Sequence, residues 1–402
     1  MSGLNYPEEE HLIKPEEAVE HAALSVLRNA PLGQFDAQVW LKSNVKKDPA
    51  VVYDLNGKPL FYICEVGQGE EMPGTVHLAA SRVLGRPELA IELGRPAWNF
   101  DTAVKRLTPR VKKEFPRSRI SAPRLIAYSY PKLGVMYEID SPSGKQRAIY
   151  DVASLGRILE RPERPDSEGA YAWSFYESLD NNRRKANLAL MRKVDKARDR
   201  LPARTRAELR KTRSLATMID KVGFTIKKSK VRKLPYSPNY AWNHARGHHC
   251  FELYAQQVDD YCAVATCQMV LAYYRYYFSQ ATIAPSLGYS PGGGCPSDQS
   301  PGYRSLSCNQ LDASFDNTPT FAEAMTQIDG LHPFKSGIPG HARACAGYSI
   351  SYITPIGSDF QKLLIYDPWP WNADYAAGGA IRWEDWSTPT KTNYVTTKIK
   401  CP

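Results

Sequence analysis

The stretch from Cys262 to Phe278 follows a polar loop and constrains the fold more than any other part of the chain. Its apolar residues recur at helical spacing, so we expect a helix over residues 262–278 with one buried face. The residues predicted to form that face are Thr266, Met269, Val270, Tyr273 and Tyr277. Cys262 would stand where the loop becomes the helix. Unpaired N–H groups and the positive end of the helix dipole favour a thiolate there, so this cysteine is a candidate nucleophile.

A cysteine nucleophile needs a base, and the base needs an orienting group. His341 is predicted to open a strand directly after the turn Gly337-Ile-Pro-Gly340. Asp367 ends the apolar run Leu363–Tyr366, and the following proline stops that strand. Gln256 lies six residues before the cysteine, and its amide can donate to an oxyanion formed at an attacked carbonyl. These residues predict an acyl-transfer site.

The pattern Gln256, Cys262, His341, Asp367 resembles the papain-like cysteine peptidases. It is closest to the compact bacterial and archaeal branch that includes the double-glycine leader peptidases. That branch has a glutamine before Cys-x-x-Ala, then Gly-His on a strand, then Asp-Pro, and the resemblance covers about residues 250–390. It implies a Cys-His-Asp triad, a Gln256 oxyanion hole, a protein or peptide substrate, and no cofactor or metal. Ala263 departs from the Gly or Trp of many relatives, and Gln257 remains an alternative to Gln256.

The whole chain is predicted to be α+β, with three parts. Residues 1–160 form an α+β domain with a helix at 14–30, a hairpin around Asn56-Gly57 and a meander of strands. Residues 161–235 form a basic helical linker, with helices at 173–201 and 203–222 and an extended segment at 223–234. Residues 236–402 form a papain-like catalytic domain, in which the helix that carries Cys262 packs on an antiparallel sheet. Its other expected elements are a helix at 320–329 and strands at 342–354 and 362–366.

The N-terminal domain is similar in pattern to the prosegments of secreted cysteine peptidases of the streptopain-like kind. The hairpin at residues 53–66, followed by a glycine-rich stretch, carries this similarity. It implies a zymogen in which the chain's own N-terminal region covers the cleft as an intramolecular inhibitor. The basic span 183–233 would then be a polar connector that offers activation cleavage sites.

The formal net charge of +10 is concentrated in the middle of the chain. Residues 101–235 carry a net charge of +18, whereas residues 1–100 carry −5 and residues 236–402 carry −3. A basic segment can bind nucleic acid or anionic lipid, but no nucleic-acid motif accompanies the charge, so we expect no nucleic-acid partner. We favour a solvated helical face or docking on acidic neighbours. A basic binding protein with a silent papain-like domain, and an acyltransferase or transpeptidase that uses the same site, remain as alternatives.

Seven of the eight cysteines follow residue 249, which predicts up to three disulfides besides Cys262 and an oxidising compartment. Suitable disulfide pairs are Cys250–Cys401 and Cys295–Cys308. Cys267 and Cys345 are instead predicted to be buried free thiols. The first ten residues lack the apolar core of a signal peptide, so an extracellular or cell-surface location requires that a leader has been removed; a cytoplasmic location is the alternative. No apolar run of about 18 residues predicts a membrane span. A metal site at His244, His248, His249 and Cys250 is less favoured, because a second ligand pair is missing.

Overall fold

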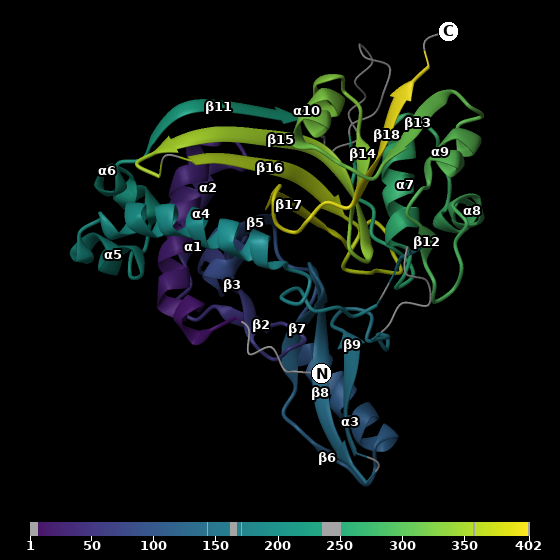
Figure 1. Cartoon of the computed structure of the whole chain (residues 1–402), viewed down its shortest axis with the longest axis horizontal. Coiled ribbons are helices and arrows are strands. Elements are labelled where there is room, and N and C mark those ends of the chain that lie inside the picture. The colour runs from purple at the N-terminus through teal and green to yellow at the C-terminus, as the bar shows by residue number, and fades with distance from the viewer. Residues whose placement is uncertain are drawn as a thin grey trace.

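The structure is a computed structural model that describes residues 7–142, 144–160, 167–169, 171–234, 251–356 and 358–400. Its mixture of helices with a large, mostly antiparallel sheet confirms the α+β class (Figure 1). The bounds of the three predicted domains stay predictions. Among the described residues, no helix combines the length and the apolar character that a membrane crossing requires.

The N-terminal half is built on the predicted hairpin. Strands β2 (Ala50–Tyr53) and β3 (Pro59–Gln68) pair antiparallel, and Gly57 takes the left-handed conformation of the turn with φ of +83°. Strands β4 (Glu71–Ala79) and β5 (Glu88–Leu93) extend this sheet, and helix α1 (Pro15–Asn29) packs on it where a helix was predicted. The small elements beside them are α2 (Ala37–Lys42), β1 (Asn44–Val45) and the 3-10 turns Glu9–His11, Ala30–Leu32 and Arg82–Leu84.

A β-arm projects from this half at the bottom of Figure 1. It consists of α3 (Phe100–Glu114), β6 (Arg119–Ile120), β7 (Arg124–Ser129), β8 (Lys132–Ser141) and β9 (Gly144–Asp151). Helix α3 begins at the capping side chain of Asn99 and buries Leu107 and Val111. Strands β7, β8 and β9 match the predicted meander. The arm brings the start of β8 to the C-terminal half.

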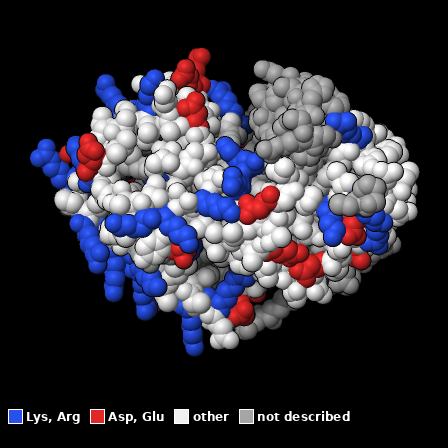
Figure 2. All heavy atoms as spheres, turned by 90° about the horizontal axis from the view of Figure 1, so that it is seen from above, with Lys and Arg blue, Asp and Glu red and all other residues white. Residues whose placement is uncertain are grey.

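The described part of the predicted linker, residues 161–235, forms helices and strands. It contains β10 (Ser167–Glu168), α4 (Asn181–Asp199), α5 (Ala203–Leu209), the 3-10 turn Leu215–Met218, α6 (Ile219–Val222) and β11 (Thr225–Lys233). Helix α4 begins later than the predicted residue 173, because Asp180 caps its first turn. Strand β11 pairs along β15, so this part of the chain is built into the sheet. Figure 2 shows Lys and Arg side chains gathered on the left, where Figure 1 places α4 to α6.

The C-terminal half packs helix α7 (Cys262–Tyr273) on an antiparallel sheet. The sheet contains β13 (Leu311–Asp316), β14 (Phe334–Ile338), β15 (His341–Thr354), β16 (Ser358–Asp367), β17 (Ala380–Asp385) and β18 (Asn393–Ile399). The other elements are α8 (Gln280–Ser286), β12 (Cys295–Pro296), α9 (Ser300–Leu306) and α10 (Phe321–Asp329). Helix α7 ends five residues before the predicted Phe278. The prediction that Tyr277 is buried was wrong, since 59% of this residue is exposed.

One sheet runs through both halves, because β17 pairs antiparallel with β5. Trp383 lies opposite Ile91 across this junction, and both side chains are fully buried. Buried ion pairs cross the same boundary: Glu88 of β5 pairs with Lys362 of β16, and Glu92 pairs with Arg382 at 3.2 Å. The two halves therefore share a core and a hydrogen-bond ladder.

The six described cysteines are free thiols. The predicted Cys295–Cys308 disulfide was wrong: Cys295 is buried in β12, whereas Cys308 is exposed in the turn after α9. Cys267 and Cys345 are buried free thiols, as predicted. The proposed Cys250–Cys401 pair and the cluster His244, His248, His249 lie outside the described residues. Cys295 and Cys308 therefore give no support to the predicted oxidising compartment.

Candidate active site

Cys262 is the first residue of α7, where the sequence placed it. It has no exposed surface. Burial raises the pKa of its thiol, while the positive charge of Lys132 and a hydrogen bond from the backbone N–H of Ala342 act in the opposite direction. Ala342 follows His341 on β15, so the sulfur lies against the start of the strand that carries the candidate base.

His341 and Asp367 form a direct contact. His341 Nε2 lies 2.7 Å from Asp367 Oδ1, and neither residue has exposed surface. Burial lowers the pKa of His341 to about 4 although Asp367 opposes this, so the imidazole is neutral near pH 7. An ionised carboxylate only accepts hydrogen bonds, so Nε2 carries the proton and Nδ1 has the free lone pair. Nδ1 has no hydrogen-bond partner among the described residues, which leaves it available to accept a proton.

Asp367 is held as a carboxylate. Burial alone would raise its pKa, but the neighbouring His341 and Arg382 outweigh burial and lower it. The backbone N–H of Trp369 donates to Asp367 Oδ1 at 2.9 Å, and Arg382 Nη1 lies 3.6 Å from Oδ2. These contacts fix the carboxylate in the position that orients the imidazole.

Gln256 lies beside the end of β16, because its backbone N–H donates to the carbonyl oxygen of Pro368 at 2.9 Å. Its side-chain Nε2 donates to the carbonyl oxygens of Val258 at 3.0 Å and Asp259 at 2.6 Å. In this conformation the amide therefore holds the loop before α7. The alternative residue, Gln257, donates instead to the carbonyl oxygen of Ala373 at 3.0 Å.

Lys132 is a buried residue beside the candidate site that sequence reasoning missed. It comes from β8 of the β-arm and has no exposed surface. Its Nζ donates to the carbonyl oxygens of Gly169 at 3.0 Å and Gly340 at 3.1 Å. Gly340 immediately precedes His341, and the charge of Lys132 contributes to the lowered pKa of that histidine. The sequence marks it only weakly, as one lysine between Pro131 and the uncharged run 133–137.

The segment after the β-arm completes a cover over the site. The cover comprises residues 167–169 and 171–173 together with Lys132. The ring of Tyr171 lies directly on Gly340, where an added Cβ would stand only 3.1 Å from the ring. Nearby, Trp369 Nε1 donates to Asp151 Oδ2 of the β-arm at 2.7 Å. Groups from the N-terminal half thus contribute to the complete burial of Cys262, His341 and Asp367.

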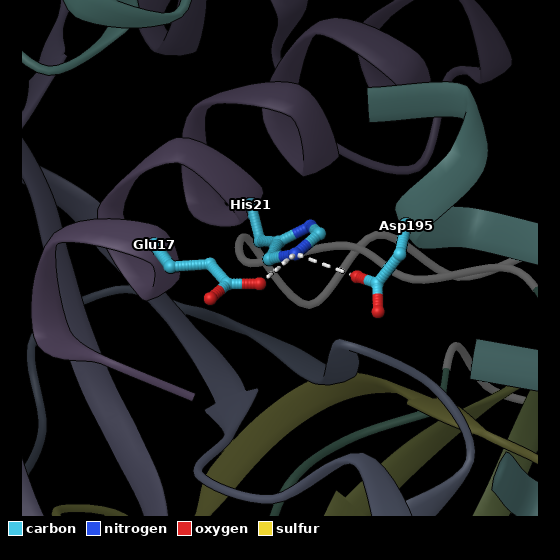
Figure 3. Close-up of side chains that lie close together, drawn as sticks. All are labelled: Glu17, His21 and Asp195. Atoms are coloured by element: carbon cyan, nitrogen blue, oxygen red, sulfur yellow. Dashed lines mark ion pairs between the residues drawn. The ribbon is translucent and has the colours of Figure 1, made fainter. Parts of the chain in front are cut away.

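A cluster of potential metal ligands lies elsewhere, where α1 meets α4. Figure 3 shows His21 between the carboxylates of Glu17 and Asp195. Two arginines already pair with these carboxylates: Arg82 contacts Glu17 at 2.5 Å and Asp195 at 2.9 Å, and Arg198 also contacts Glu17. Because guanidinium groups neutralise both acids, the arrangement fits an ion-pair cluster between two helices better than a metal centre.

Part of the chain matches a known family model. Residues 248–389 match the Peptidase_C39 like family, and this segment contains Cys262, His341 and Asp367. No curated protein matched the sequence. Among solved structures, the crystal structure of UfSP from C. elegans aligns with 18% identity and a TM-score of 0.28 over 43% of this chain. The alignment spans 34% of that structure's own length. The family match supports a cysteine peptidase.

Proposed function

We propose that the chain hydrolyses peptide bonds with Cys262 as nucleophile, His341 as general base and acid, and Asp367 as the group that orients the imidazole. The observation that carries this proposal is the 2.7 Å contact between His341 and Asp367 beside the start of α7. There, the sulfur of Cys262 accepts the N–H of the residue that follows His341.

The geometry supports a defined sequence of proton transfers. The Cys262 proton passes to Nδ1 of His341, and the thiolate attacks the peptide carbonyl carbon, forming a C–S bond. The Cys262 N–H, and the Gln256 amide once it turns away from Val258 and Asp259, hold the oxyanion. His341 then gives its proton to the leaving amine as the C–N bond breaks. Water hydrolyses the thioester by the reverse exchange, and Asp367 stabilises the imidazolium throughout.

In the covered conformation, this mechanism leaves the site inactive. Burial raises the pKa of the thiol and lowers that of the imidazole, so the resting pair is neutral. Cys262 and His341 have no exposed surface, and a substrate would have to occupy space filled by the cover. Displacement of the cover would hydrate both groups and shift both pKa values back toward the thiolate–imidazolium pair. The N-terminal half thus acts as an intramolecular inhibitor, and the chain is a zymogen.

The test is incubation of the purified full-length chain with reductant, followed by intact mass. We expect wild type to produce defined fragments and the C262A variant to produce none. The C308S variant is the matched control, because it removes an exposed thiol outside the site and should process like wild type. Identical fragments from wild type and C262A would contradict the proposal. An added amine acceptor separates hydrolysis from acyl transfer, because transfer would join the amine to the new C-terminus.

A further inference from the structure

The cover enters the catalytic half as a strand. Ser167 and Glu168 of β10 pair antiparallel with Pro296 and Cys295 of β12. Gly294, just before β12, must be a glycine, because a Cβ there would stand 2.1 Å from the carbonyl oxygen of Glu168. Adding a strand to an exposed edge is a general way for a protein to bind a peptide, with side-chain pockets supplying specificity. The pairing therefore resembles a bound peptide.

The side chain of Glu168 fills a polar pocket in the catalytic half. Its Oε1 lies 2.5 Å from Lys335 Nζ and 3.2 Å from Asn393 Nδ2, and its Oε2 accepts from Gln299 Nε2 at 2.8 Å. Glu168 is only 2% exposed, and its three partners are buried. They come from β14, β18 and the residue that precedes α9, so the C-terminal half alone supplies the pocket.

The pocket is held together without Glu168. Lys335 Nζ also donates to the carbonyl oxygen of Ser297 at 3.1 Å and contacts Asn393 Oδ1 at 2.5 Å. Gln299 Nε2 also donates to the carbonyl oxygen of Pro296 at 2.8 Å. When the cover leaves, these contacts keep a cation in a buried site that lacks its carboxylate. Such a site favours an incoming acidic group, because an unpaired buried charge is costly.

The pocket is close to the thiol. The carboxylate of Glu168 adds to the effect of burial in raising the pKa of Cys262. Burial raises the pKa of Tyr171, and the nearby carboxylate of Glu168 raises it further. Lys132 Nζ donates to the carbonyl oxygens of both Gly169 and Gly340, and Tyr171 also lies on Gly340. The described residues of the cover therefore lie beside the residue that precedes His341.

We propose that Lys335, Gln299 and Asn393 form a substrate subsite that selects an acidic side chain, and that Glu168 occupies it as an internal substrate mimic. This inference rests on the proposed peptidase function. The competing explanation is an ion pair that merely fastens the two halves together.

Charge reversal distinguishes these explanations. The double variant E168K/K335E keeps an ion pair across the boundary but reverses the charge of the pocket. Peptides with the sequence of residues 163–175 would carry either Glu or Lys at the position of Glu168. After self-processing in reductant, we expect wild type to cleave the Glu peptide with about 100-fold higher kcat/KM than the Lys peptide. The double variant should prefer the Lys peptide. The D312K/K398E variant, which reverses an exposed pair at 3.4 Å, should keep the wild-type preference.

Equal cleavage of both peptides by wild type, or a retained Glu preference in E168K/K335E, would overturn the subsite while leaving the peptidase function intact. A binding measurement covers the opposite case, in which the subsite exists but the chain is not a peptidase. The C262A/E168A variant lacks the nucleophile and the internal acidic side chain, and it should bind the Glu peptide more tightly than the Lys peptide. Selective binding without cleavage by any form would support the pocket and overturn the peptidase function. Absence of both binding selectivity and cleavage would overturn both.

Discussion

His341 is neutral in this structure because burial has a larger effect on its pKa than the carboxylate beside it. A neutral imidazole with its proton on Nε2 is the form that accepts a proton from a thiol at Nδ1. Asp367 selects that form, since its oxygen 2.7 Å from Nε2 can only accept. The orientation of the base therefore depends on one carboxylate oxygen.

The D367N variant tests this dependence. An amide in place of the carboxylate can donate to Nε2 and favour the wrong tautomer, so we expect kcat to fall by about 10²–10⁴-fold. Peptide hydrolysis at pH 7 provides the measurement. The D312N variant, at a partly exposed carboxylate paired with Lys398, is the control and should keep wild-type kcat. Unchanged kcat in D367N would exclude Asp367 as the orienting group.

The lowered pKa of buried His77 predicts that the stability of the fold depends on pH. Burial is the main cause that lowers the pKa of His77 to about 3, below its usual 6.5. Between those values the unfolded chain binds a proton that the folded chain does not, so falling pH favours unfolding. Below pH 6.5, wild type should lose about 1.4 kcal/mol of unfolding free energy per pH unit more than H77Q does. Urea titrations at pH 7 and pH 5.5 measure the difference; parallel losses in both proteins would contradict the assignment.

Cys262, His341 and Asp367 could be selected from sequence because each has a local marker: a helix start, a Gly-Pro turn and an Asp-Pro strand end. Lys132 and Glu168 have no such marker. Their roles depend on burial against segments more than 120 residues away, as with Lys132 and Gly340 or Glu168 and Lys335. A charged residue in a sequence is normally exposed, and only tertiary packing shows the exceptions.

At the scale of elements, the junction between β5 and β17 determines how the halves are connected. Local patterns predicted the hairpin of β2 and β3 and the helix α1, because turn residues and apolar spacing are encoded within a few positions. The pairing of β5 with β17 was not predicted, because no local sequence pattern identifies the strand that pairs with β5 almost 300 residues later. The pairing of β11 with β15 was not predicted for the same reason.

The K362M variant probes this junction. Lys362 on β16 pairs with buried Glu88 on β5, and its Nζ also donates to Asn29 Oδ1 at 2.9 Å. Removing the ammonium leaves a buried carboxylate with one cation fewer, so we expect a loss of about 3 kcal/mol of unfolding free energy. K398M removes the exposed partner of Asp312 and should cost less than about 1 kcal/mol. Denaturant midpoints compare the two, and equal losses would show that the junction pair is not stabilising.

At the scale of the whole molecule, the cysteine thiols differ in their exposure to solvent. Among the described cysteines, Cys308 is exposed and the other five are buried. We expect iodoacetamide to modify Cys308 rapidly in the native chain and Cys262 only after the cover is displaced. Peptide mass mapping before and after addition of urea measures this order. Rapid native modification of Cys262 would show that the cover does not close the site in solution.

The shared sheet also predicts how a cut chain behaves. A protease site inserted beside the exposed Lys211 should give two fragments that remain together, because the β5–β17 ladder and the buried Glu88–Lys362 pair do not depend on that backbone bond. Size-exclusion chromatography after cleavage should show one species, which separates only in denaturant. Two native peaks would mean that the halves are independent.

The ladder between β5 and β17 sets a constraint on biosynthesis. The ribosome releases β5 some 290 residues before β17, so the edge of β5 has no partner while most of the chain is still being made. Contacts this distant in sequence form slowly. The first half must therefore fold early and persist as a platform on which the later strands complete the sheet. Expression of the C-terminal half alone would omit that platform and leave the β17 edge prone to aggregation.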